Sequence, residues 1–224
     1  MPLKQIAIRR TLAFLSIAGL AVTGALLAGN VSSILGQAKP AADAKPGVHL
    51  EVAPGTTASY RVTEQLAGVN FPSDAVGSTD VVTGNLVIAP DGSIDSAQSK
   101  LSFDLRTLKS DQDLRDGYIR NRVIDTGKFP FAEFVPKHIE GVPSPLPITG
   151  QAGFTLVGDM TIHGVTSEVT WMGIVTFAKD QVAGRATTNF AFSTFSLPKP
   201  TLARLLSVGD KIQLEIEFKM KKEE

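Results

Sequence analysis

The side chains that most often do chemistry in proteins are few in this sequence, and they stand far apart. The 224 residues contain no cysteine and three histidines, His49, His138 and His163. A chain without cysteine forms no disulfide, no thiolate nucleophile and no cysteine zinc site. Histidines this widely separated do not show the close ligand spacing that is typical of metal sites. The sequence therefore predicts neither a bound metal nor a cofactor.

One of these histidines lies in the strongest catalytic candidate of the chain, a predicted hairpin turn. His163 precedes Gly164, and Asp159 and Glu168 lie on either side of the turn. A turn histidine is usually solvated or hydrogen-bonded to the backbone, and no serine in a nucleophile elbow accompanies this one. We therefore expect that the protein is not an enzyme, and we assign no catalytic residue.

A second group of chemically useful side chains lies in the charged segment 109–125. Arg115, Arg120 and Arg122 carry guanidinium groups, whose planar fork matches the oxygens of a phosphate or another polar headgroup. They are therefore candidates to hold a headgroup at the mouth of a binding site. In the alternative interpretation the segment is a structural crossover that closes one end of the fold. Arg115 would then pair with a carboxylate elsewhere.

The same segment is the place where the sequence predicts helical structure. Ser110 and Asp113 have the spacing of a capping box, and Leu114 and Tyr118 share a helical face. Gly117 lowers the helix propensity. We therefore expect one or two short helical turns here.

Overall composition narrows the class of protein and its partners. Hydrophobic residues make up 43% of the chain and charged residues 20%, which is typical of globular proteins and excludes a wholly disordered chain. The 22 Lys and Arg residues balance the 22 Asp and Glu residues. Proteins that bind nucleic acid through its phosphates usually carry a positive excess, so we expect no nucleic-acid partner.

The N-terminal segment, residues 1–35, has the pattern of an export signal. Lys4, Arg9 and Arg10 precede an apolar run over residues 11–29, whose length as a helix, roughly 28 Å, is close to the thickness of a bilayer. This run exceeds the core of about 7–15 residues in a cleaved signal peptide, which favours an uncleaved anchor. Gly36 and Ala38 nevertheless offer a small-x-small cleavage site, so a removed signal peptide stays open. Basic residues remain cytoplasmic, so the rest of the chain is expected outside the inner membrane, tethered to it through this segment.

The remaining chain divides into a linker and one domain. Residues 36–48 are rich in Pro and Ala and show no apolar periodicity, which predicts an extended linker. Residues 49–222 are enough to bury a sizeable core as one domain.

This domain shows the two-residue periodicity of β-strands. Ile212, Leu214, Ile216 and Phe218 alternate with polar residues. Trp171, Gly173, Val175 and Phe177 share one face of another strand, and Met172 and Ile174 on its other face suggest that both faces are covered. Further strands are predicted over residues 59–63, 81–89, 101–105, 153–162 and 186–192. Turns are predicted at residues 90–92, 163–164, 179–180 and 209–210, and an extended surface loop over the proline-rich residues 136–147. Many short strands with regular turns indicate an all-β sandwich or antiparallel barrel.

Three blocks of this domain resemble the YceI-like family of periplasmic polyisoprenoid-binding proteins. The first block is residues 110–119, followed by Lys128-Phe129-Pro130 and Phe134, where an Arg-Asp pair precedes an aromatic-Pro pair and a Phe. The second is the hairpin sequence over residues 156–166. The third is residues 190–197 with Ser207-Val208-Gly209-Asp210. Many relatives place an Arg before a Phe-Gly pair in the third block, but residues 192–196 contain neither Arg nor Gly. The contact that such an Arg would make with the headgroup of a ligand is therefore not expected at this place in the chain.

The resemblance implies an eight-stranded antiparallel lipocalin-like barrel, with the short helical insert and the N-terminal hydrophobic helix outside it. It also implies an apolar channel for a long lipid. An eight-stranded barrel can hold one ligand or be filled by its own side chains. Our candidates for ligand-binding residues are Phe103, Leu105, Phe154, Leu156, Trp171, Phe190 and Phe192, with Arg115, Arg120 and Arg122 at the mouth.

Three functions follow from these observations. The leading one is an exported carrier or sequestering protein for an isoprenoid lipid, such as a quinone or a polyprenyl compound, bound to the membrane if the N-terminal segment is retained. The second is an envelope or stress-related interaction module with a filled barrel. The third is an enzyme acting on a bound lipid, which would need a titratable pair in the channel. Association of two chains as a homodimer stays open.

Overall fold

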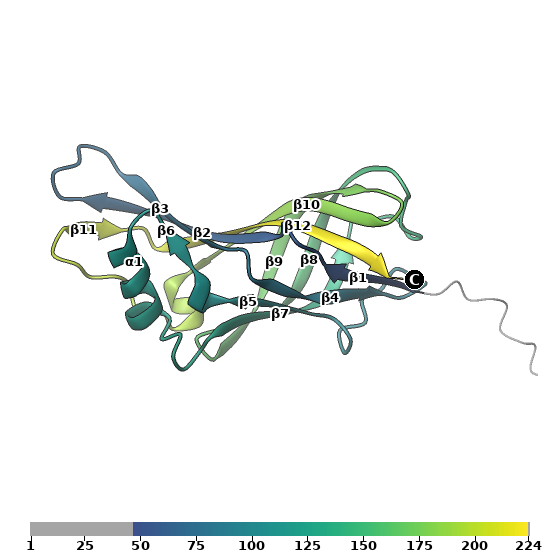
Figure 1. Cartoon of the computed structure of the whole chain (residues 1–224), viewed down its shortest axis with the longest axis horizontal. Helices are drawn as coiled ribbons and strands as arrows, with labels where there is room; N and C mark the ends of the chain where they lie inside the picture. Colours follow the sequence, from purple (N-terminus) through teal and green to yellow (C-terminus); the bar gives the residue numbers. More distant parts are fainter. Residues whose placement is uncertain (1–46, 224) are drawn as a thin grey trace, which may run out of the picture. The chain divides into compact units, whose positions relative to one another are not determined.

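Eight antiparallel strands close into a barrel in the computed structural model, which describes residues 47–223 (Figure 1). Around the ring the order is β1-β4-β5-β7-β8-β9-β10-β12, and β12 pairs back with β1. The strands are β1 (Val48–Val52), β4 (Val82–Ile88), β5 (Lys100–Asp104), β7 (Phe131–Glu140), β8 (Gly150–Ile162), β9 (Val165–Phe177), β10 (Gln181–Ala191) and β12 (Lys211–Glu223). This arrangement confirms the predicted eight-stranded antiparallel barrel.

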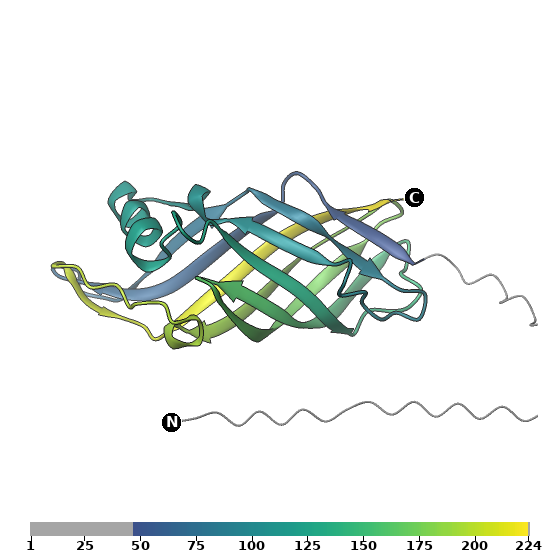
Figure 2. The ribbon, with the colours of Figure 1, turned by 90° about the horizontal axis from the view of Figure 1, so that it is seen from below.

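Four further strands extend the wall at one end of the barrel. They are β2 (Thr57–Leu66), β3 (Ser73–Thr79), the short β6 (Lys109–Ser110) and β11 (Leu205–Val208). The first half of β12 pairs with β2, whereas its last residues pair with β1 at the opposite end. We call the end that carries β2, β3, β6 and β11 the mouth, and the end where β1 begins the far end (Figures 1 and 2).

The helical segment also lies at the mouth. Helix α1 (Asp113–Tyr118) continues into a wider π-type turn (Ile119–Val123). Short 3-10 turns follow β5 (Leu105–Thr107) and β10 (Phe192–Phe195). No helix among residues 47–223 has the length and apolar character needed to cross a membrane. The predicted N-terminal hydrophobic helix and almost all of the predicted linker lie outside the described residues.

The long β8–β9 hairpin shows how the sequence pattern orients the barrel wall. A two-residue turn, His163-Gly164, joins the strands, and both residues have positive φ (54° and 74°), as a tight hairpin turn requires. Trp171, Val175 and Phe177 are buried on the inner face, as predicted. The prediction that both faces of β9 are covered is wrong. Met172 and Ile174 are exposed, because no other element of residues 47–223 covers the outer face of this strand.

The proline-rich segment was predicted as a loop throughout, and this is wrong for its first part. Residues 136–140 belong to β7, and only the following residues form the loop to β8. The register of β7 against β8 shifts between Pro136 and His138. A proline has no N–H to donate, so it is tolerated in a strand where such a bulge interrupts the hydrogen-bond ladder. The period-two pattern was hidden by a residue that usually ends strands.

The helical turns occur where the sequence predicts them, but the predicted capping box does not form. Gln112, the residue before α1, is its N-cap, and its side chain makes no capping hydrogen bond. Ser110 instead donates from its backbone N–H (2.9 Å) and its hydroxyl (2.6 Å) to one carboxylate oxygen of the buried Asp116. Asp116 therefore fixes the strand β6 against the helix. Leu114 and Tyr118 do not share one environment, since Leu114 is exposed and Tyr118 half-buried.

Candidate functional site

The inward-facing side chains leave two cavities inside the barrel, one behind the other along its axis. The cavity at the mouth has a volume of about 150 Å³, and the cavity toward the far end has a volume of about 90 Å³. We call them the mouth compartment and the inner compartment. Every strand of the barrel ring contributes to one or both of them, because alternate residues of each strand point inward.

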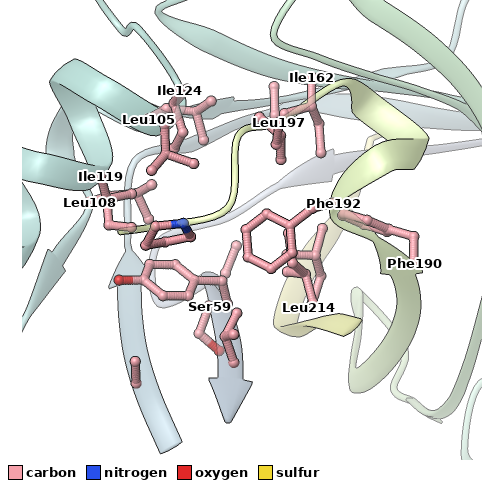
Figure 3. Close-up of a pocket in the computed structure, with 18 of the residues that line it drawn as sticks. Ser59, Leu105, Leu108, Ile119, Ile124, Ile162, Phe190, Phe192, Leu197 and Leu214 are labelled. Atoms are coloured by element: carbon pink, nitrogen blue, oxygen red, sulfur yellow. The ribbon is translucent and has the colours of Figure 1, made fainter. Parts of the chain in front are cut away.

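The mouth compartment is lined mainly by apolar side chains from β2, the helical segment, β10 and β12 (Figure 3). Ile119 and Leu108 cover it from the helical side, and Phe190, Phe192 and Leu214 face them from the barrel wall (Figure 3). Its polar lining residues are Ser59, Tyr60, Glu64, Thr79, Arg115 and Glu215. Leu202 lines the compartment and is also exposed, so the cavity reaches the surface at the mouth.

The inner compartment is almost wholly apolar. Apart from the indole of Trp171, its one polar lining residue is Thr56, whose hydroxyl already bonds to the backbone of Ala53 and Lys219. It ends on side chains that are themselves buried, namely Leu50, Phe177, Val182 and Met220. Leu146, from the β7–β8 loop, adds to the wall at this end. The compartment is therefore a pocket that suits an apolar group.

Two residues belong to the walls of both compartments, Phe103 on β5 and Trp171 on β9. Each side chain is 5% exposed, and Trp171 packs edge-to-face on Phe134 with 6.2 Å between ring centroids. The indole N–H of Trp171 is buried and has no hydrogen-bond partner among the described residues. We call this narrow point, formed by Phe103 and Trp171, the waist. It divides one channel into two parts.

The structure places all seven predicted ligand-binding residues on these walls. Leu105, Phe190 and Phe192 line the mouth compartment, Phe154 and Leu156 line the inner compartment, and Phe103 and Trp171 line both. These residues lie on or directly after β5, β8, β9 and β10, and their side chains line the channel because alternate residues of a strand point inward. Their contact with a ligand stays a prediction.

The three predicted headgroup arginines do not come together. Arg115 lines the mouth compartment and is held by two carboxylates, Glu64 at 2.8 Å and Asp111. Burial opposes its charge, but these carboxylates outweigh that effect and raise the pKa of Arg115. Arg120 donates to the backbone carbonyl of Leu108 at 2.7 Å, and Arg122 is exposed without an ion pair in the described part of the chain. The three diverge because the helical segment turns each in another direction.

Tyr60 on β2 is a site residue that the sequence reasoning missed. Its ring lines the mouth compartment, and burial raises the pKa of Tyr60 to about 12. The hydroxyl therefore stays protonated and can donate a hydrogen bond throughout the physiological range. Ala58, Tyr60, Val62 and Glu64 all line this cavity with the period of a strand, and that alternation was the available signal.

The predicted catalytic candidate around His163 does not assemble into acid–base machinery. Asp159 and Glu168 both bind Lys137, at 2.6 and 3.5 Å. The His163 ring packs edge-to-face on Phe129, with 4.8 Å between centroids. The carboxylates flanking the hairpin thus serve an ion-pair cluster on the β7–β8–β9 surface.

A family model described as the YceI-like domain matches residues 52–220. Among solved structures, a polyisoprenoid binding domain from Saccharophagus degradans, described as implicated in plant cell wall breakdown, is similar with a TM-score of 0.62. It is 14% identical, and the match covers 78% of this chain and 98% of that one.

Two other solved structures share the fold. BcnA from Burkholderia cenocepacia has a TM-score of 0.55 and 16% identity, over 75% of this chain and 98% of that one. The YCEI protein of Campylobacter jejuni has a TM-score of 0.54 and 14% identity, over 71% of this chain and 91% of that one. No curated protein is significantly similar to this chain. At such identities the similarity to solved structures shows the fold, and function has to be argued from the site.

Proposed function

The chain belongs to the YceI-like family, and from that premise we propose that it binds an isoprenoid-type lipid, a quinone or a polyprenyl compound, for carriage or sequestration. The observation that carries the proposal is the channel itself. Two apolar compartments adjoin at Phe103 and Trp171, and the inner one offers a ligand almost no polar contact. A ligand that fits such a wall is long, narrow and hydrocarbon over most of its length.

The driving force for this binding is hydrophobic transfer. Each buried CH2 group contributes about 0.8 kcal/mol when it leaves water. A prenyl chain is poorly soluble in water and is one linear chain that carries only small methyl branches. It therefore gains this hydrophobic free energy along the whole channel. Flat aromatic walls at the waist suit the planar isoprene units, whereas a bulky polar ligand would leave its hydrogen-bonding groups unsatisfied in the inner compartment.

We place the polar end of the lipid in the mouth compartment. Tyr60 offers a protonated hydroxyl there, and Arg115 offers a guanidinium already oriented by Glu64 and Asp111. Of the arginines predicted from the sequence, Arg120 and Arg122 do not line the cavity, so they would meet a headgroup only outside it. The seven predicted wall residues, from Phe103 to Phe192, would then contact the hydrocarbon chain.

We further propose that the protein works outside the inner membrane, tethered to it by its N-terminal segment, and that it does not transform the lipid chemically. The basic residues before the apolar run 11–29 support export. The similarity to the polyisoprenoid binding domain of Saccharophagus degradans supports binding as the activity. The two cavities favour this function over an interaction module with a filled barrel.

Mass spectrometry of an organic extract tests the proposal. The domain 47–224 is a suitable sample, because it lies within one compact unit and contains the whole of the matched family model. It would be exported, purified without detergent and extracted. We expect a prenyl lipid near one per chain. A protein that carries no lipid, and that takes up neither added quinone nor added polyprenol, would contradict the proposal.

A further inference from the structure

Five large apolar side chains are exposed around the mouth of the channel. Phe71 is 77% exposed, Leu114 90% and Leu206 66%, and Val69 and Leu202 are about half exposed. They come from three separate segments, the β2–β3 loop, helix α1, and β11 with the loop before it. We call these five residues the rim. A cluster of exposed apolar side chains at one site usually marks a binding surface.

The three rim segments are tied to one another, so the rim is one surface. Strand β11 pairs with β2 at Leu205 and Leu66, and Ala67 donates its N–H to the carbonyl of Arg204 at 2.8 Å. The hydroxyl of Tyr118, at the end of α1, accepts from the backbone N–H of Thr201 at 3.2 Å. All three segments project from the same end of the barrel (Figures 1 and 2).

The rim also surrounds the way into the mouth compartment. Leu202 belongs to the rim and lines the cavity, and Arg115, the neighbour of Leu114, lines it from α1. A lipid that leaves a bilayer for this channel would cross water unless the rim itself enters the bilayer surface. Apolar side chains at the rim remove that aqueous step, because they are buried among the lipid chains while the channel opens directly onto them.

The charges near the rim are mixed. Arg122 and Arg204 are exposed and form no ion pair in the part of the chain that the structure describes, and each basic residue near an anionic membrane surface adds to binding. Lys199, however, pairs with Asp210 at 2.8 Å, and the exposed Asp113 lies beside Leu114 on α1. The exposed apolar side chains around the channel opening therefore carry the argument for a bilayer.

We propose that the rim is a membrane-docking surface that inserts into a phospholipid bilayer and places the channel mouth against it. This inference rests on the lipid-binding function proposed above.

Flotation with vesicles of phosphatidylethanolamine and phosphatidylglycerol tests the proposal on the domain 47–224. In the rim variant, Phe71, Leu114 and Leu206 are each replaced by serine. The matched control carries Met172→Ser and Ile174→Ser, which removes exposed apolar side chains from the outer face of β9. We expect the rim variant to bind vesicles at least about tenfold more weakly than the parent, with the control unchanged. Transfer of quinone from donor vesicles should slow in parallel.

The bound lipid and the oligomeric state separate the other outcomes. A rim variant that floats like the parent, or a control that loses binding equally, overturns docking while leaving the proposed function intact if both variants retain lipid after purification. Loss of a dimer in the rim variant, seen by sedimentation without vesicles, would instead assign the rim to contact between two chains. Absence of lipid and of quinone uptake in the parent would overturn both proposals.

Discussion

Phe103 on β5 and Trp171 on β9 each line both compartments, although the strands β7 and β8 lie between β5 and β9 in the barrel order. A long ligand that extends from the mouth into the inner compartment would therefore have to pass the waist that these two side chains form.

Replacing Trp171 by alanine should lower lipid retention without unfolding the domain. The change removes a side chain from both walls and its contact with Phe134, so a loss of stability of about 3 kcal/mol is expected. Lipid per chain, measured by mass spectrometry, and chemical denaturation report the two effects separately. Trp171→Phe is the control and should retain most of the lipid. Unchanged lipid content in Trp171→Ala would remove the residue from the binding site, and loss of the fold would make it ordinary core.

Arg115→Met should destabilise the mouth because it leaves the nearly buried Glu64 carboxylate without its partner. Only 11% of the Glu64 side chain is exposed, so we expect a loss of about 1–3 kcal/mol in denaturation experiments. Arg122→Met, at an exposed position without an ion pair among residues 47–223, serves as the control and should be nearly neutral. Combining Arg115→Met with Glu64→Gln should recover part of the loss. Equal effects of both single arginine variants would contradict the role of the ion pair.

Asp104 should make the domain sensitive to acid. Its carboxylate caps the 3-10 turn that carries Leu105 and accepts two hydrogen bonds from the Arg106 guanidinium, at 2.9 and 2.6 Å. The guanidinium holds the pKa of Asp104 below its ordinary value. The ordinary pKa of an aspartate in an unfolded chain is about 4. The stability that the Asp104–Arg106 pair contributes is fully present above this pH and is lost as the pH falls through the lower pKa of the folded state.

Asp104→Asn keeps an oxygen that can cap the turn but loses the charge that pairs with Arg106, so it should cost roughly 0.2–1 kcal/mol at neutral pH. Its stability should converge with that of the parent in acid. Denaturation curves recorded across the acid range check this. A constant difference between the two proteins at every pH would show that Asp104 acts through packing.

Tyr60 should make the domain sensitive to alkali. Burial raises the pKa of Tyr60 to about 12, above the value of about 10 in an unfolded chain. The folded protein therefore holds the Tyr60 proton more tightly than the unfolded chain does. The contribution of this proton to folding stability is fully present below about pH 10 and is lost as the pH rises toward 12. Tyr60 is partly exposed to the cavity, so the difference is about 1–2 kcal/mol. Tyr60→Phe should not show this alkaline loss of stability, which denaturation curves recorded across the alkaline range would measure. Parallel profiles for the two proteins would contradict the role of Tyr60.

The sequence predicted the barrel because its strongest signals are local and periodic. Ile212 and Ile216 on β12 and Trp171 on β9 alternate with polar or exposed residues, and this fixes the inward face of each strand before any partner strand is known. Pro136 hid the strand β7, since a bulge accepts a residue that a regular ladder excludes. Short strands such as β6, with two residues, carry no pattern that could be recognised.

The polar part of the site was predicted less well, for a different reason. Arg115 and Glu64 form an ion pair although 51 residues separate them in the sequence, and Tyr60 lines the same cavity as Arg115. Such neighbours are brought together by the fold, so no local sequence pattern predicts them. The rim likewise joins residues from three separate segments, and each of these residues looked like an isolated apolar residue in the sequence.

The far end of the inner compartment has a consequence for which lipid fits. The buried side chains of Leu50, Phe177, Val182 and Met220 lie at the end of the channel that is farthest from the mouth. A hydrocarbon tail that reaches them would fill the whole depth of the two compartments. The channel would then act as a ruler, because longer tails would leave part of their length outside it.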